Sequence, residues 1–108
     1  MKVLVIDDDV NVLDFLKTFF DHLNHETVTT ASPIEGLKKL VTEEPDLVLL
    51  DIMMPEKDGL TVLKEIKEID TQVTVVMITA YKNILAPTIR KNKSPAHFLI
   101  LTVDDDVP

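Results

Sequence analysis

The chain has 108 residues, enough for one domain with a modest hydrophobic core, so residues 1–108 are expected to form a single domain. Its 19 acidic and 11 basic residues give a formal charge of −8, which repels nucleic-acid phosphates and anionic membranes. No stretch reaches membrane-spanning length, and direct binding to nucleic acid or membrane is not expected. Cysteine is absent, which excludes disulfides and cysteine-ligated metals and is typical of the cytoplasm.

The first half of the chain alternates between apolar runs and helical periodicity. Residues 2–6, KVLVI, are typical of a buried strand, and residues 10–23 repeat apolar side chains at helical spacing. A weaker β pattern covers residues 26–31. Ser32, followed by proline and, three residues on, by glutamate, has the form of a capping box and predicts a helix that ends near Pro45.

The second half continues the alternation. Residues 47–50 form another continuous apolar strand, residues 60–69 place apolar side chains on one helical face, and residues 73–78 form a further strand. Continuous apolar strands joined by helices are typical of a parallel sheet that is covered on both faces. The pattern therefore predicts a doubly wound α/β domain.

Side chains that can do chemistry follow these strands. Asp7, Asp8 and Asp9 follow the first strand, Asp51 follows a central one, and Thr79 follows the last. A parallel sheet brings these ends to one edge, where two or three carboxylates repel one another unless a hard cation such as Mg²⁺ joins them. A carboxylate beside Mg²⁺ is a competent nucleophile for phosphoryl transfer, and a threonine hydroxyl could donate to a phosphoryl oxygen.

A simpler interpretation exists for some of these residues. An acid at a strand-to-helix junction often caps the next helix, which is the expected role of Asp9. Asp58-Gly59 is in the first place a turn signal, and Met53 is a loop residue. Capping does not explain acids after two different strands together with a threonine after a third. We therefore interpret the whole set as a phosphoryl-transfer site.

Three segments carry a family resemblance, namely VLVIDDD, DLVLLDIMMPEKDGLTVLKEI and VTVVMITAY. Over residues 1–81 the chain resembles the receiver domain of two-component response regulators. The resemblance implies a flavodoxin-like fold, in which a doubly wound parallel sheet has five strands in the order 2-1-3-4-5.

The same resemblance implies a role for each residue of the site. Asp51 would be the phosphoacceptor. Asp8 and Asp51 would be direct ligands of Mg²⁺, the backbone carbonyl of Met53 would be a third ligand, and Asp7 would complete the acid pair through a water molecule. Thr79 would be the switch hydroxyl that turns toward the phosphoryl group.

The resemblance further implies a signalling domain, not an enzyme, that catalyses only its own phosphorylation and dephosphorylation. The phosphoryl group would come from a histidine kinase or a phosphotransfer protein. Movement of the face around the fourth and fifth strands would then alter contacts with an output domain or effector protein.

Residues 82–108 depart from the family pattern. Leu101 and Thr102 stand where the family places a lysine followed by a proline. That lysine contacts the phosphoryl oxygens, so its replacement removes a positive charge that holds the phosphorylated state. Phe98 falls near the position of the family's switch aromatic and is the candidate for that role.

The same segment also lacks a clean helical pattern. Pro87 and Pro95 interrupt the region of a fourth helix, so we expect that helix to be short or distorted. The chain ends at Pro108 without a fifth helix, which would leave apolar surface open. We therefore expect a homodimer formed through the C-terminal segment, with that segment swapped or rearranged.

Two other functions fit part of the sequence. A degenerate receiver would be a phosphorylation-independent protein-interaction module, which Leu101 favours and the intact acidic pocket opposes. A metal-dependent phosphatase resembling the haloacid dehalogenase superfamily would use Asp7 as nucleophile and Asp9 as acid and base. Against it, Asn11 replaces the expected threonine or valine, and the motif around Asp51 would have no explanation.

Overall fold

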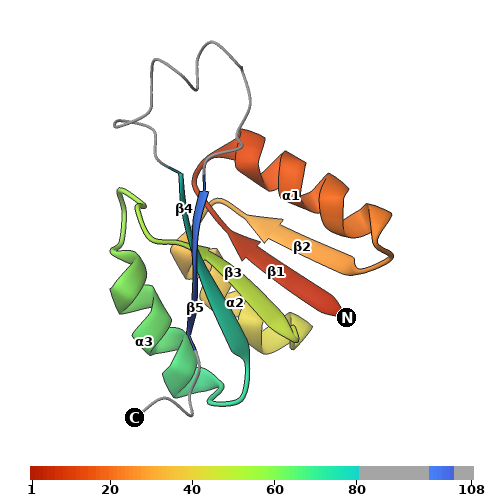
Figure 1. The fold of residues 1–108 in the computed structure, drawn as a ribbon. Helices are drawn as coiled ribbons and strands as arrows, with labels where there is room; N and C mark the ends of the chain where they lie inside the picture. Colours follow the sequence, from red (N-terminus) through yellow and green to blue (C-terminus); the bar gives the residue numbers. More distant parts are fainter. Residues whose placement is uncertain (81–97, 104–108) are drawn as a thin grey trace, which may run out of the picture.

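The computed structural model describes residues 1–80 and 98–103, with residues 79–80 and 98–103 described by their backbone. Strands and helices alternate up to β4 and close to the bounds expected from the sequence (Figure 1). No helix in this part of the chain is long and apolar enough to cross a membrane. The elements are β1 (Lys2–Ile6), α1 (Val10–His22), β2 (Glu26–Thr30), α2 (Pro33–Glu43), β3 (Leu47–Asp51), α3 (Gly59–Ile69), β4 (Thr74–Ala80) and β5 (Phe98–Val103).

The strands form one sheet in the order β2-β1-β3-β4-β5. β1 pairs in parallel with β2 on one side and β3 on the other, and β3 pairs in parallel with β4. α1 lies on one face of this sheet, while α2 and α3 lie on the opposite face (Figure 1). The predicted doubly wound α/β class and the strand order are therefore confirmed.

The prediction of an entirely parallel sheet is wrong at β5, which runs antiparallel to β4 with Phe98 opposite Ala80. A parallel fifth strand needs a crossover, normally a helix, that returns the chain to the far end of the sheet. Pro87 and Pro95 interrupt any helical pattern between the two strands. An antiparallel strand begins at the end where β4 stops, so it needs no such crossover.

Several predictions for the C-terminal part concern residues 82–97 and 104–108, which lie outside the described residues. They include the distorted fourth helix, the missing fifth helix and the exchange of the C-terminal segment.

The core lies on both faces of the sheet because successive strand residues point to opposite sides. On the face covered by α1, the residues Val3, Val5, Leu49 and Ile78 pack with Leu13 of the helix. The other face is larger. Its buried residues come from β1, β3, β4, α2, α3 and the loops after β3 and α3, and they are Leu4, Ile6, Leu40, Val48, Leu50, Met54, Val62, Ile66, Val73, Val75 and Met77.

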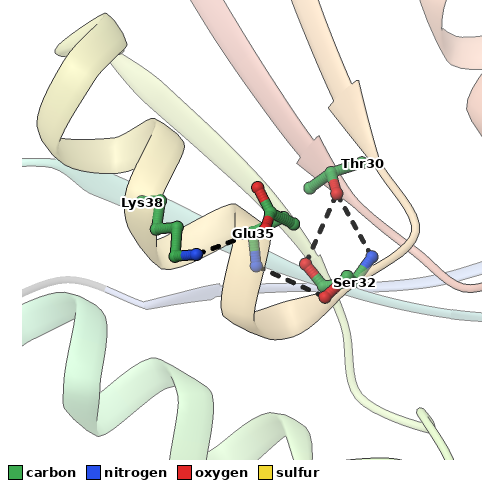
Figure 2. A network of polar contacts seen from close by, with 4 residues as sticks. All are labelled: Thr30, Ser32, Glu35 and Lys38. Carbon is green, nitrogen blue, oxygen red and sulfur yellow. Dashed lines mark hydrogen bonds and ion pairs between the residues drawn. The ribbon is translucent and has the colours of Figure 1, made fainter.

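The start of α2 shows how the sequence sets a helix boundary (Figure 2). The Ser32 hydroxyl accepts a hydrogen bond from the backbone N–H of Glu35 at 3.3 Å, which confirms the predicted N-cap. In a full capping box the Glu35 side chain would also accept a hydrogen bond from the Ser32 N–H, but here both groups have other partners. The Ser32 N–H donates to the hydroxyl of Thr30 at 3.2 Å, and the Glu35 carboxylate pairs with Lys38 instead.

One buried hydroxyl on β2 generates a stability prediction. Thr27 is 8% exposed and its Oγ1 has no hydrogen-bond partner among the described residues. Thr27→Val removes this desolvated polar atom, so we expect the free energy of unfolding to rise by about 1 kcal/mol in urea denaturation. Thr29→Val, two residues along the same strand at a half-buried site, serves as control and is expected to change the free energy less. A loss of stability in Thr27→Val would contradict this account.

Candidate functional site

The acids predicted at the strand ends come together at the carboxyl edge of the sheet. β1 and β3 are adjacent and in register, with Ile6 opposite Leu50, so the residues that follow them are neighbours. One carboxylate oxygen each of Asp7, Asp8 and Asp51 lie within 4.8 Å of one another. Asp7 and Asp51 are buried, and Asp8 is exposed. The sheet therefore forms an acidic cluster that is open to solvent on the side of Asp8.

Backbone hydrogen bonds hold the loop after β1. The N–H of Asp7 donates to the carbonyl of Thr30 at the end of β2, at 3.2 Å. Asp7 Oδ1 accepts from the N–H of Asp9 at 2.8 Å. Asp9 in turn caps α1, because its Oδ1 accepts from the N–H of Asn11 at 2.9 Å. The predicted capping role of Asp9 is confirmed, and it separates this acid from the cluster of three.

The loop after β3 is fixed at its start and at its end. The Met53 N–H donates to Asp51 Oδ1 at 3.0 Å, which orients the buried carboxylate. At the other end, the N–H of Gly59 donates to the carbonyl of Ile52 at 3.1 Å. The Asp58 side chain caps α3 by accepting from the N–H of Leu60. The turn predicted at Asp58-Gly59 is thus the N-terminus of α3.

Gly59 has a structural role that the sequence analysis did not assign. A Cβ atom at this position would lie 2.6 Å from Ile52 Cα and 2.8 Å from the Asp51 carbonyl oxygen. Both are backbone atoms, which cannot turn away as the end of a side chain can. Gly59 therefore allows α3 to begin directly against the end of β3. In the sequence, this role is indicated by a glycine that lies eight residues after Asp51 and directly follows the capping Asp58.

Electrostatics in the cluster favour the neutral form of Asp51. The pKa of Asp51 is raised to about 7, mainly by burial; the hydrogen bond from the Met53 N–H opposes this rise, and the negative charge of Asp7 contributes to it. A cation bound among the three carboxylates would supply the missing counter-charge. Carboxylate oxygens are the ligands of hard cations such as Mg²⁺, so the donor set fits that class of ion.

The remaining predicted site residues are Thr79 and Phe98, which the structure places by their backbone, and Met53, whose side chain is exposed. Asp51 is opposite Ile78 in the β3–β4 register, so the next residue of β4, Thr79, follows at the same edge. Phe98 begins β5 opposite Ala80, also at this edge. The side chains of Thr79 and Phe98 lie outside the described residues.

The fold and the site define a doubly wound α/β protein with a three-carboxylate cluster at the carboxyl edge of its parallel strands. The sequence profile described as "Response regulator receiver domain" matches residues 3–97. The chain belongs to this family, as its resemblance predicted. Receiver domains are signalling domains of two-component response regulators, and they interact with histidine kinases or phosphotransfer proteins and with output domains.

Curated relatives agree with the family assignment. The chain is 36% identical over 80 residues to the sporulation initiation phosphotransferase F of Bacillus subtilis (strain 168), a match that covers 74% of this chain and 64% of that protein. It is 34% identical over 79 residues to the alkaline phosphatase synthesis transcriptional regulatory protein PhoP of the same organism, covering 73% of this chain and 33% of that one. The chain thus spans less than two thirds of the length of either relative.

A solved structure supports the fold. The CheY-like response regulator receiver domain protein of Methanospirillum hungatei JF-1 superposes with a TM-score of 0.71 at 27% sequence identity. The superposition covers 84% of this chain and 73% of that chain.

The pKa of Asp51 predicts a specific dependence of stability on pH. In the metal-free fold Asp51 keeps its proton up to about pH 7, whereas an unfolded aspartate releases it near 4, so stability falls as pH rises between these values. Asp51→Asn removes this titration. With EDTA present, we expect the advantage of Asp51→Asn over the natural chain to grow by roughly 3 kcal/mol from pH 4.5 to pH 8 in urea denaturation. Stability curves that stay parallel across this range would contradict the raised pKa.

The close contact at Gly59 predicts a cost for any side chain there. Gly59→Ala forces the backbone at residues 51 and 52 to shift, so we expect a loss of about 2 kcal/mol in the free energy of unfolding. Gly36→Ala in α2 is the matched control, because its added Cβ would meet the side-chain end of Ile6. We expect the smaller loss in the control, and equal losses would argue against a special role for Gly59.

Proposed function

We propose that this chain receives a phosphoryl group on the carboxylate of Asp51 and thereby switches a protein interaction in signal transduction. The observation that carries the proposal is the burial of Asp51 at the end of β3, with carboxylate oxygens of Asp7 and Asp8 within 4.8 Å. Helix capping does not require such a cluster, because Asp9 already caps α1 and Asp58 caps α3.

The cation of this site is proposed to be Mg²⁺. Asp8 and Asp51 would bind it directly, the backbone carbonyl of Met53 would be a third ligand, and Asp7 would act through a water molecule. The support is the all-oxygen donor set and the burial of Asp51, whose ionised form lacks a described positive partner. When bound, the ion supplies positive charge that favours the carboxylate form of Asp51 and neutralises the incoming phosphoryl oxygens.

In the proposed reaction an Asp51 carboxylate oxygen attacks phosphorus, and the bond from phosphorus to the donor breaks. With a phosphohistidine donor the leaving group is the imidazole, and an acyl phosphate is left on Asp51. The hydrogen bond from the Met53 N–H holds the carboxylate in a fixed orientation during the attack. Thr79, which follows at the same sheet edge, is the proposed switch hydroxyl, and Phe98 the proposed switch aromatic.

The proposed partners follow from family membership. A histidine kinase or phosphotransfer protein would be the phosphoryl donor, and an output domain or effector protein would respond to the phosphorylated state. The chain would catalyse only its own phosphorylation and dephosphorylation, and would work in the cytoplasm, where these donors are. A homodimer is proposed through the C-terminal segment, since β5 is an edge strand of the sheet.

A degenerate receiver remains the second candidate because of the direction of β5. In the antiparallel register Leu101 lies opposite Met77, in the middle of the strand pair, and Phe98 rather than the end of β5 is near the acidic edge. The family's lysine is replaced by Leu101, so β5 offers no cation there to hold a phosphoryl group. Partner binding that is unchanged by Asp51→Asn would favour this phosphorylation-independent function.

Phosphorylation by acetyl phosphate tests the proposal directly. We expect intact mass spectrometry to show one added phosphoryl group with Mg²⁺, and none with EDTA, because the carboxylate cluster needs the cation to accept further negative charge. Asp51→Asn should abolish the addition, while Asp14→Asn, which changes an exposed acid on α1, should leave it intact. A folded natural chain that gains no phosphoryl group would instead support the degenerate receiver.

A further inference from the structure

An ion pair joins the loop after β3 to the helix that follows it. Lys57 lies near the end of this loop, and its Nζ is 2.6 Å from Oε1 of Glu65, in the second turn of α3. The two side chains are 31% and 33% exposed, and Oε1 of Glu65 is itself buried. We call this pair the loop clamp.

The loop clamp differs from the ion pairs on the helix surfaces. Lys17–Asp21 and Lys38–Glu35 each lie within one helix or at its first turn, at 3.0 and 3.4 Å, and their side chains are about half exposed or more. Such pairs contribute little, because water and salt screen them. The loop clamp is shorter and more buried, and it bridges a loop and a helix.

The position of the clamp relates it to Asp51. The loop consists of residues 52–58, and its first part is held by the hydrogen bond from the Met53 N–H to Asp51 and by the buried side chain of Met54. The N–H of Gly59 donates to the carbonyl of Ile52, and this hydrogen bond joins the two ends of the loop. The loop clamp adds a further attachment, from Lys57 near the end of the loop to Glu65 of α3.

We propose that Lys57 and Glu65 are positioning residues, which hold the loop so that the backbone of Met53 faces the acidic cluster. This inference rests on the proposed function, since it assigns the pair to cation binding and phosphorylation at Asp51. Neither residue touches the reacting atoms. Their effect passes through the loop, in the way that residues behind a metal ligand fix its orientation.

The test compares four forms of the chain: the natural one, Lys57→Met, Lys57→Arg and Lys38→Met. Lys57→Met keeps much of the side-chain bulk and removes the charge, Lys57→Arg restores it, and Lys38→Met breaks an exposed pair on α2 as a control. Three quantities are measured: hydrogen exchange of the Met53 and Gly59 amides without metal, affinity for Mg²⁺ by calorimetry, and the rate of phosphorylation by acetyl phosphate.

For Lys57→Met we expect several-fold faster exchange of the two loop amides and an affinity for Mg²⁺ weaker by on the order of 10-fold. Phosphorylation at subsaturating Mg²⁺ should slow with it and recover when Mg²⁺ is raised. Lys57→Arg should resemble the natural chain, and so should Lys38→Met. A purely structural role would lower the midpoint of urea denaturation without this selective change in the loop.

Exchange and Mg²⁺ affinity that are unchanged in Lys57→Met would overturn the inference. Failure of the proposed function gives a different result, because the natural chain itself would then bind no Mg²⁺ and gain no phosphoryl group. In that case faster exchange of the Met53 amide in Lys57→Met would still establish that the clamp holds the loop, but its assigned role at Asp51 would be rejected.

Discussion

Repulsion between carboxylates at one edge of the sheet is the constraint on which the site depends. Parallel pairing of β1 with β3 puts Asp7 and Asp51 side by side in a buried place, in a chain whose formal charge is already −8. Burial alone disfavours the charged form of a carboxylate, and a like charge nearby adds to this. The fold therefore holds an arrangement that becomes favourable when a cation or a proton joins it.

The surroundings of Asp51 hold its carboxylate in place at the end of β3. Asp51 is the last residue of β3, Gly59 lets α3 start against the strand end, and the Met53 N–H holds one carboxylate oxygen. The pair of Lys57 and Glu65 attaches the end of the loop to α3. Rigid elements on both sides of a site keep its groups in place before a ligand arrives, which reduces the reorganisation needed for reaction.

The direction of β5 affects the proposed switch residues but not the acidic cluster. The acids belong to β1, β3 and their following loops, and they do not depend on β5. The antiparallel pairing places Leu101 in mid-strand and Phe98 at the acidic edge. Under the proposed function, acceptance of a phosphoryl group and its transmission to a partner would use different strands and could be lost independently.

Local patterns in the sequence determined the type and order of the elements up to β4, the cap residues Asp9 and Ser32, and the acids at the strand ends. Periods of two and 3.6 residues and capping preferences act between near neighbours, so they can be read along the chain. Tertiary structure alone decided the rest. The antiparallel β5 and the raised pKa of Asp51 depend on how separate strands come together in the sheet. The close approach at Gly59 and the Lys57–Glu65 pair depend on how α3 folds back against the end of β3 and its loop, and no helical or strand periodicity encodes that geometry.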